Sequence, residues 1–153
     1  MKYWLMKSEP DVYGIAHLKK EGSTVWDGVR NYQVRNMLRD DFSPGDKALF
    51  YHSNAGKETG VVGVMEVVSD ALPDPSQFDA ASEYYDPKAT KPNPTWLTRR
   101  MKYIETFSEL VTLEELRKAR IFAGSPLIQK GNRLSIIPVS KSQFEFVCKR
   151  GRV

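Results

Sequence analysis

The sequence contains a single cysteine, Cys148, among its 153 residues, so no internal disulfide can form. A chain of this length folds without a covalent or metal staple, because it buries about 68–70 % of its unfolded surface. The lack of disulfides fits a reducing compartment. We therefore expect a cytoplasmic protein in which Cys148 is a small core residue rather than a nucleophile.

Histidine is almost as scarce, with His17 and His52 alone in the chain. No two histidines or cysteines stand at the spacing of zinc ligands, and no Asp-x-Asp cluster marks an oxygen-ligand site. The glycine-rich loops of nucleoside-triphosphate and dinucleotide folds are absent, as is the Gly-x-Ser-x-Gly elbow of hydrolases. We expect no metal and no cofactor, and these enzyme classes are excluded.

Long hydrophobic runs are missing as well. The apolar run near the N-terminus is too short and too interrupted for a signal peptide or a membrane span, so we expect no membrane association. Repeats and low-complexity tracts are absent, and one domain over residues 1–153 is expected, as a monomer. The net charge of +4, from 23 basic and 19 acidic residues, permits a polyanionic partner without requiring one.

What the chain does have is a loop, residues 26–32, in which a tryptophan is followed by several polar residues. An Asp-Gly turn follows Trp26, and Arg30, Asn31 and Tyr32 come next, ahead of an apolar stripe at helical spacing. A lone tryptophan most often plugs a core. The polar neighbours favour a second interpretation, in which Trp26 forms the wall of a pocket at the start of a helix with a basic face.

The remaining pattern predicts an α+β fold with more strand than helix. The first strand is apolar on both sides and should be central, and Pro138 makes the last strand peripheral. Gly60 and Gly63 indicate a bulge, a bend or the close approach of a ligand. The strand that starts at Leu97 is basic on both sides at first, so it should lie at an edge or beside a phosphate. Strands are predicted over residues 2–7, 47–52, 60–68, 97–107 and 133–139, and short helices over 15–21, after Tyr32, from 112 to 120 and after Ser140.

The second and third of these strands form a hairpin in the centre of the sheet. Residues 73–94 are rich in Pro and Asp and irregular, which is typical of a functional or covering loop. Together the elements predict a curled, barrel-like mixed sheet of roughly five to six strands with short flanking helices.

Polar tripeptides leave the ends of two core strands, Lys7-Ser8-Glu9 and His52-Ser53-Asn54. Each alone is ordinary, since Ser and Asn cap turns. Neighbouring strands of a barrel would bring both to one mouth beside Trp26. Such a pocket suits a flat ring with hydrogen-bonding edges, and a nucleobase stacked on an aromatic side chain gains about 1–3 kcal/mol.

Reaching a base inside a duplex requires flipping it out, which costs a few kcal/mol that phosphate contacts must offset. For each cation that could make such contacts, the alternative interpretation is an ordinary solvated surface charge. The candidates are Arg30, Arg35, Arg39, Lys88, Lys91, Arg99 and Arg100.

Five stretches, in order along the chain, resemble the signature of the EVE domain family. They are Tyr3–Pro10, Trp26–Gln33 with Arg35-Asn36, Phe50–Asn54, Tyr85-Asp86-Pro87 and Gly131–Ser135. The resemblance implies a PUA-like fold related to YTH domains, which read N6-methyladenine in RNA through an aromatic cage. It further implies a non-catalytic module that binds modified bases, such as 5-methylcytosine derivatives or methyladenine, in DNA or RNA.

The resemblance also assigns roles to residues. Trp26 would be the stacking wall of the pocket. Lys7, Ser8, Asn31, Ser53 and Asn54 would line it or read the base. Tyr32, His52 and Tyr85 would lie at its rim or behind it.

Two alternatives stay open. Some PUA-like relatives hydrolyse modified nucleosides with a lysine, a hydroxyl and a carboxylate, and Lys7, Ser8 and Glu9 supply these types. Neighbours on a strand point to opposite faces, however, so Ser8 could join the other two only if the chain turns there. The second alternative is a small-ligand or protein-interaction domain whose basic surface is incidental.

Overall fold

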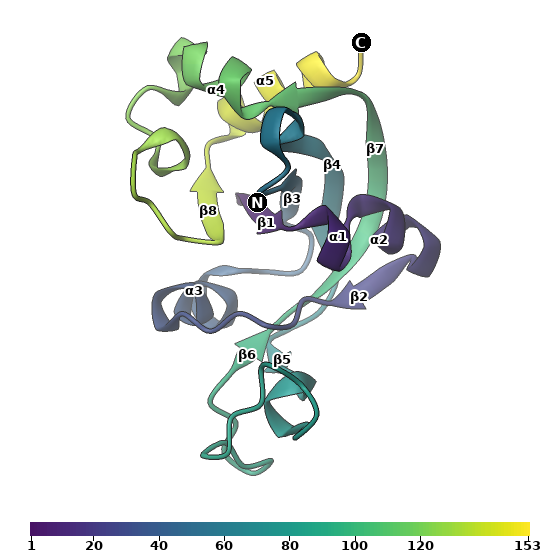
Figure 1. The fold of residues 1–153 in the computed structure, drawn as a ribbon, viewed down its shortest axis with the longest axis vertical. Coiled ribbons are helices and arrows are strands. Elements are labelled where there is room, and N and C mark those ends of the chain that lie inside the picture. Colours follow the sequence, from purple (N-terminus) through teal and green to yellow (C-terminus); the bar gives the residue numbers. More distant parts are fainter.

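The computed structural model describes residues 1–153 and is built around a six-stranded mixed sheet with strand order β2-β7-β4-β3-β1-β8 (Figure 1). A ribbon of two short strands, β5 and β6, stands apart from it. The strands are β1 (Tyr3–Ser8), β2 (Ser23–Val25), β3 (Lys47–His52), β4 (Gly60–Val67), β5 (Leu72–Pro73), β6 (Leu97–Thr98), β7 (Arg100–Thr112) and β8 (Ile136–Val139). The α-helices are α1 (Pro10–Tyr13), α2 (Ile15–Glu21), α3 (Tyr32–Asn36), α4 (Leu113–Lys118) and α5 (Lys141–Gly151), and α3 continues into a π-helical turn (Met37–Asp41).

The central position expected for β1 is confirmed. It pairs in parallel with β3 and antiparallel with β8. Its side chains alternate between two buried faces, with Trp4 and Met6 in one hydrophobic cluster and Leu5 in the other. The parallel register sets Ser8 opposite His52, so both polar tripeptides follow the C-terminal ends of neighbouring strands and lie on the same side of the sheet.

The predicted bulge at Gly63 is confirmed and bends the sheet. The register of β4 against β7 shifts between Val61 and Gly63. A Cβ atom on Gly63 would lie 2.2 Å from the Glu105 carbonyl oxygen and 2.3 Å from the Ile15 Cδ1 atom, so the close neighbour is the protein itself and not a ligand. The sheet curls into a half-barrel with short flanking helices, which confirms the α+β, PUA-like fold.

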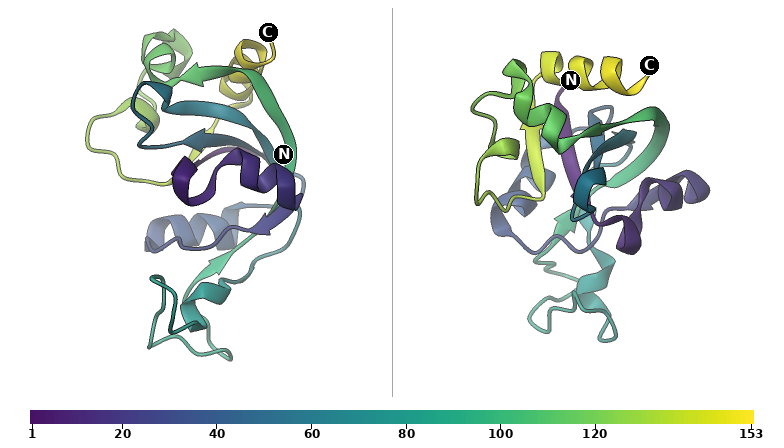
Figure 2. Two further views of the ribbon diagram at one scale, coloured as in Figure 1. Left: turned by 45° about the vertical axis from the view of Figure 1, so that its right-hand side comes forward. Right: turned by 45° about the horizontal axis from the view of Figure 1, so that its top comes forward.

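Both faces of the sheet are covered. On one face α2, α3 and the loop that holds Trp26 bury the cluster around Phe50 and Met65. On the other, α4, α5 and the turns between them bury the cluster around Leu49 and Val64 (Figure 2). Cys148 lies in this second cluster, where burial raises the pKa of its thiol to about 11, as suits a core residue.

The strand predicted over residues 97–107 differs from expectation in two ways. It is broken at Arg99 into β6 and β7, and β7 continues to Thr112. It is also not at an edge, because β2 pairs with its first residues, with Ser23 opposite Lys102. The sequence conceals β2 because Ser23–Val25 is too short to show an alternating pattern.

The segment between β5 and β6 projects away from the sheet, at the opposite end from α4 and α5 (Figures 1 and 2). Gln77 ties the two ends of the segment together. Its amide donates to the carbonyl oxygens of Asp74 and Trp96, and its own oxygen accepts from the Trp96 backbone N–H. The irregular loop is therefore an ordered flap fixed at its base. None of the helices is long and apolar enough to cross a lipid bilayer.

Candidate ligand pocket at the ends of β1 and β3

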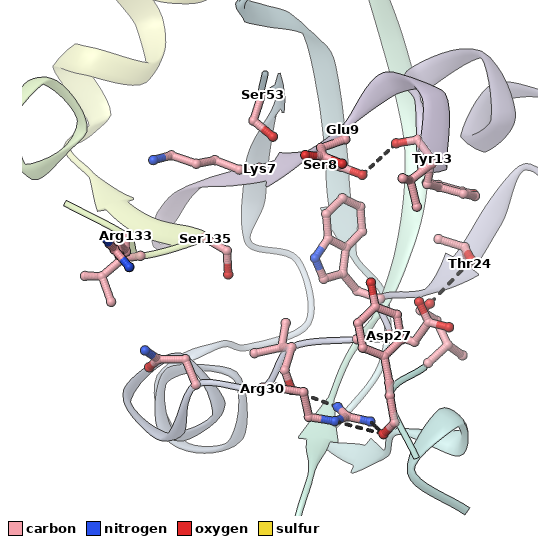
Figure 3. A pocket seen from close by; sticks show the side chains of 18 residues that line it. Lys7, Ser8, Glu9, Tyr13, Thr24, Asp27, Arg30, Ser53, Arg133 and Ser135 are labelled. Carbon is pink, nitrogen blue, oxygen red and sulfur yellow. Dashed lines mark hydrogen bonds between the residues drawn. The ribbon is translucent and has the colours of Figure 1, made fainter. Parts of the chain in front are cut away.

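A cavity of about 460 Å³ opens where β1 and β3 end, a size typical of ligand pockets (Figure 3). The convergence expected from the sequence is present, since residues from both strand ends and from the Trp26 loop share its wall. The lining residues are Lys7, Ser8, Glu9, Val12, Tyr13, Thr24, Val25, Trp26, Asp27, Gly28, Val29, Arg30, Asn31, Ser53, Tyr84, Arg133, Leu134 and Ser135.

Trp26 is both a core residue and a wall of the cavity. Its side chain is 7 % exposed and makes edge contacts with Phe50 and Tyr13, with ring centroids 5.5 and 6.4 Å away. The indole N–H groups of Trp4 and Trp96 donate to the carboxylates of Asp46 and Asp86, but that of Trp26 has no acceptor in the protein. No buried side-chain nitrogen or oxygen is left unpaired, so this N–H faces the cavity.

The loop that carries Trp26 is held in place by Asp74 on the neighbouring segment. One carboxylate oxygen of Asp74 accepts from the Gly28 backbone N–H at 2.8 Å and from the Arg30 guanidinium at 3.0 Å. The other accepts from the backbone N–H and hydroxyl of Ser76 at 2.8 and 2.6 Å. Asp74 is buried and all four hydrogen bonds satisfy its charge, so the loop is locked to the flap.

Gly28 allows Tyr84 to close one side of the cavity. Gly28 has φ +85°, and a Cβ atom there would lie 2.8 Å from the Tyr84 ring. Tyr84 therefore packs on bare backbone and lines the cavity, whereas Tyr85, the residue expected from the resemblance, is 43 % exposed and outside it. Sequence alone does not say which of two adjacent tyrosines turns inward.

A stack of two aromatic rings with an arginine on each side joins the flap to α3. Arg35 lies 5.0 Å from the Tyr32 ring centroid, Tyr32 stacks on Trp96 at 4.8 Å, and Arg30 lies 5.0 Å from Trp96. Arg30 also lies 5.6 Å from the Tyr84 ring and donates to the Tyr84 carbonyl oxygen. Tyr32 thus supports the pocket from outside it, while its own side chain is on the surface.

The remaining expected pocket residues divide into two groups. Asn31 lines the cavity while its side-chain oxygen caps α3 by accepting from Val34 N–H. His52 lies outside the lining, and its Nε2 accepts from the Ile15 backbone N–H at 3.1 Å. Asn54 also lies outside the lining, in a left-handed conformation with φ 52°, and its amide donates to Glu9 at 2.6 Å.

Of the expected phosphate contacts, Arg99 is corrected by the structure. It is 5 % exposed, and its guanidinium donates to the carbonyl oxygens of Leu38, Arg39 and Ser69. Such a side chain holds the π-helical turn against the sheet and cannot reach a phosphate. The break in the strand at Arg99 is what turns it inward.

The other expected cations lie nearer the surface, in different states. Arg39 is paired with Asp40, and Arg100 donates to the Ser23 hydroxyl. Arg35 donates to the Thr95 carbonyl oxygen within the aromatic stack. Lys88 and Lys91 are exposed on the flap.

Charge is unevenly distributed around the cavity, as Figure 3 shows. Lys7 and Arg133 lie on one side of it, with Ser53 and Ser135. Asp27 lies on the other side, with Tyr13 and Thr24. Burial lowers the pKa of Lys7, and partial burial together with the Asp74 charge raises the pKa of Asp27, so each ionised group lacks a full counterion in the free protein.

Several lining residues were not assigned a role from the sequence, among them Thr24, Asp27, Tyr84 and Arg133. The stretch Gly131–Ser135 belongs to the signature quoted above, and that was the available signal for Arg133 and Ser135. No group of three or more His, Cys, Asp or Glu side chains lies close enough together to hold a metal ion.

The chain matches the EVE domain family model over residues 2–150. Thymocyte nuclear protein 1 of Homo sapiens is 38 % identical over 95 % of this chain and 72 % of its own length. A crystal structure from Pseudomonas syringae is 40 % identical, with a TM-score of 0.91 over 99 % of both chains. The human protein in complex with DNA containing 5-methylcytosine is 37 % identical, with a TM-score of 0.85 over 100 % of this chain and 99 % of that one.

The YTH domain of Mmi1, solved in complex with RNA, shares the fold at a TM-score of 0.57 and 14 % identity, over 98 % of this chain and 77 % of that one. The family match spans nearly the whole chain, and the human relative confirms the resemblance seen in the five sequence stretches. The protein therefore belongs to the EVE domain family.

Proposed function

We propose that this protein binds nucleic acid that carries a modified base, and that the base enters the cavity and stacks against Trp26 without being chemically changed. The observation that carries the proposal is the unpaired indole N–H of Trp26, on a side chain that is otherwise buried, facing a cavity of about 460 Å³. Because this N–H is accessible from the cavity and bonds to no protein acceptor, a ligand acceptor can bind it, and one such hydrogen bond contributes about 0.5–1.5 kcal/mol. The human relative bound to 5-methylcytosine DNA supports the same use of the fold.

The rest of the lining suits a base and its backbone. Lys7, Ser8, Asn31 and Ser53 provide hydrogen-bonding groups around the ring, and Tyr84 faces the cavity from the flap. Arg133 and the exposed Lys88 and Lys91 provide positive charge for phosphates.

A hydrolase is the less favoured function on geometric grounds. The chain does turn after β1, so Lys7, Ser8 and Glu9 all line the cavity. The Ser8 hydroxyl, however, donates to the Tyr13 carbonyl oxygen at 2.6 Å, and Glu9 accepts from Asn54. A nucleophile needs a base within hydrogen-bond reach, and neither Lys7 nor Glu9 is bonded to Ser8. Incubation with modified nucleosides would reveal turnover if this function were correct.

The test of the binding function is a titration of oligonucleotides with and without 5-methylcytosine or N6-methyladenine, read by fluorescence anisotropy. Trp26→Phe keeps an aromatic ring in the core but removes the N–H, so we expect affinity for the preferred oligonucleotide to fall about tenfold, the equivalent of one hydrogen bond. Trp96→Phe is the matched control, because it removes an indole N–H that bonds Asp86 outside the cavity. Equal affinities of the two variants, or no preference for any modified base, would contradict the proposal.

Other expectations from the sequence stay predictions: a single domain over residues 1–153, a monomer, and a cytoplasmic location. Paired DNA and RNA probes of one sequence, used in the same titration, would determine which polymer is bound.

A further inference from the structure

The cavity has two chemically different ends, and their unpaired groups specify a ligand. At one end, the Lys7 ammonium and the Arg133 guanidinium have no carboxylate partner, and the Trp26 N–H, which is accessible from the cavity, has no acceptor in the protein. All three are donors, so they match acceptors on a ligand, such as a ring carbonyl, a ring nitrogen or a phosphate oxygen.

The opposite end is built around the Asp27 carboxylate. Asp27 lies near the phenols of Tyr13 and Tyr84, whose pKa values are raised first by burial and further by the Asp27 charge. The nearest cation, the Arg30 guanidinium, is bonded to Asp74, Ser76 and the Tyr84 carbonyl. No donor from another residue hydrogen-bonds the Asp27 carboxylate, which therefore has acceptor capacity free for a ligand N–H.

We propose that Asp27 selects bases that carry an exocyclic amino group, the cytosine and adenine class, over their oxo counterparts. This inference rests on the proposed function of the cavity. An amino group of the base donates a hydrogen bond to the carboxylate. A carbonyl oxygen at the same position is itself an acceptor, so the carboxylate repels it. In cytosine the amino group lies on one side of the ring edge and the O2 acceptor on the other, which matches an acidic end and a donor end across one pocket.

The inference also explains the position of Asp27. Partial burial, together with the charge of the nearby Asp74, makes the ionised Asp27 carboxylate unfavourable in the free protein, and a hydrogen bond from a ligand N–H would stabilise it. An asparagine at this position would remove the charge and, through its NH₂ group, could donate to a ligand carbonyl.

The experiment uses two pairs of probe bases, 5-methylcytosine with thymine and adenine with hypoxanthine. In each pair, the exocyclic amino group of the first base is replaced by a carbonyl oxygen in the second. Each is placed opposite an abasic site in one duplex, so that loss of base pairing contributes equally to all probes. We expect the unaltered protein to prefer the amino member of at least one pair by about tenfold, within the range of a good base contact. Asp27→Asn should reduce that preference to about twofold or less, or reverse it. Asp11→Asn, an equal change of charge on an exposed residue outside the cavity, should leave it unchanged.

Equal binding of both members of each pair by the unaltered protein would overturn the inference, as would an unchanged preference in Asp27→Asn. Either result, if Trp26→Phe still weakens binding, leaves the proposed function in place. Failure of all four probes to bind in a saturable manner would overturn both.

Discussion

At the scale of single residues, the pocket depends on where side chains find their hydrogen-bond partners. The three tryptophans of the chain have different roles: two donate to carboxylates and Trp26 donates to none. The sequence presented core plug and pocket wall as alternatives for Trp26. The structure shows that they are compatible, because the ring packs on Phe50 while its N–H edge meets the cavity.

His52 lies outside the cavity lining, and its hydrogen bond to Ile15 predicts that the stability of the fold depends on pH. Its Nε2 accepts from the Ile15 backbone N–H, which requires a neutral imidazole, and burial lowers its pKa from the ordinary value of 6.5. The unfolded chain therefore binds this proton more readily than the folded one. Stability from this bond is complete above pH 6.5 and is lost as the pH falls through the lower pKa of the folded state.

Urea titrations at pH 7.5 and pH 5.5 measure how far the free energy of unfolding decreases between the two pH values. We expect this decrease to be larger in the unaltered protein than in His52→Gln. Glutamine keeps an oxygen that can accept from Ile15 and does not titrate. An equal fall in the two proteins would show that His52 is not the group responsible.

At the scale of elements, the flap is fixed to the Trp26 loop through one buried carboxylate. Asp74 accepts four hydrogen bonds, from Gly28, Arg30 and Ser76. Removing one partner from a buried ion pair typically costs about 3–5 kcal/mol, because the remaining charge is left uncompensated. Arg30 is partly exposed, with 22 % of its side chain accessible, so water would reduce that cost.

We expect Asp74→Ala to lower the free energy of unfolding by about 3 kcal/mol. Asp79→Ala, an exposed change on the same flap, should cost less than about 0.5 kcal/mol. Urea unfolding of both variants measures the difference. If the two were equally stable, the flap would be held by the aromatic stack around Trp96 rather than by Asp74.

The elements also show where sequence patterns are sufficient. The apolar alternation of β1, β3 and β4 and the helical spacing of α2 predict those elements to within a residue or two, because each buries a regular face. The pattern fails at β2, which is too short, and at Arg99, whose interior position depends on carbonyl oxygens from Leu38 and Ser69 far away in the chain. Long-range partners of this kind leave no periodic signal.

At the scale of the whole molecule, the candidate site was predictable in location and only in part in composition, since some of the expected residues line the cavity and others lie outside it. The apolar composition of β1 and β3 places both strands in the core of the sheet, and the parallel pairing that the structure shows brings their polar ends together. Which residues complete the wall depends on the flap and on the segment before β8, whose positions are set by tertiary contacts. Tyr84 emerged only from the fold, and so did the place of Asp27 and Arg133 in the wall, although both lie in stretches of the family signature.

The distribution of charge over the molecule leads to the last prediction, on salt dependence. Arg133 is exposed at the cavity and has no acidic partner, whereas Lys118 lies on α4, away from the cavity, and is paired with Glu114. A cation that contacts a phosphate releases counterions on binding, so each contact contributes about 0.7–0.9 to the slope of log affinity against log salt. We expect Arg133→Ala to reduce that slope by about 1 while Lys118→Ala leaves it unchanged.

Anisotropy titrations of one oligonucleotide over a series of salt concentrations would measure the slopes. A binding constant independent of salt in the unaltered protein would indicate that the net charge of +4 does not serve phosphate binding. The cavity would then hold a free base or nucleoside rather than a nucleotide within a strand, because only the latter places phosphates beside Arg133.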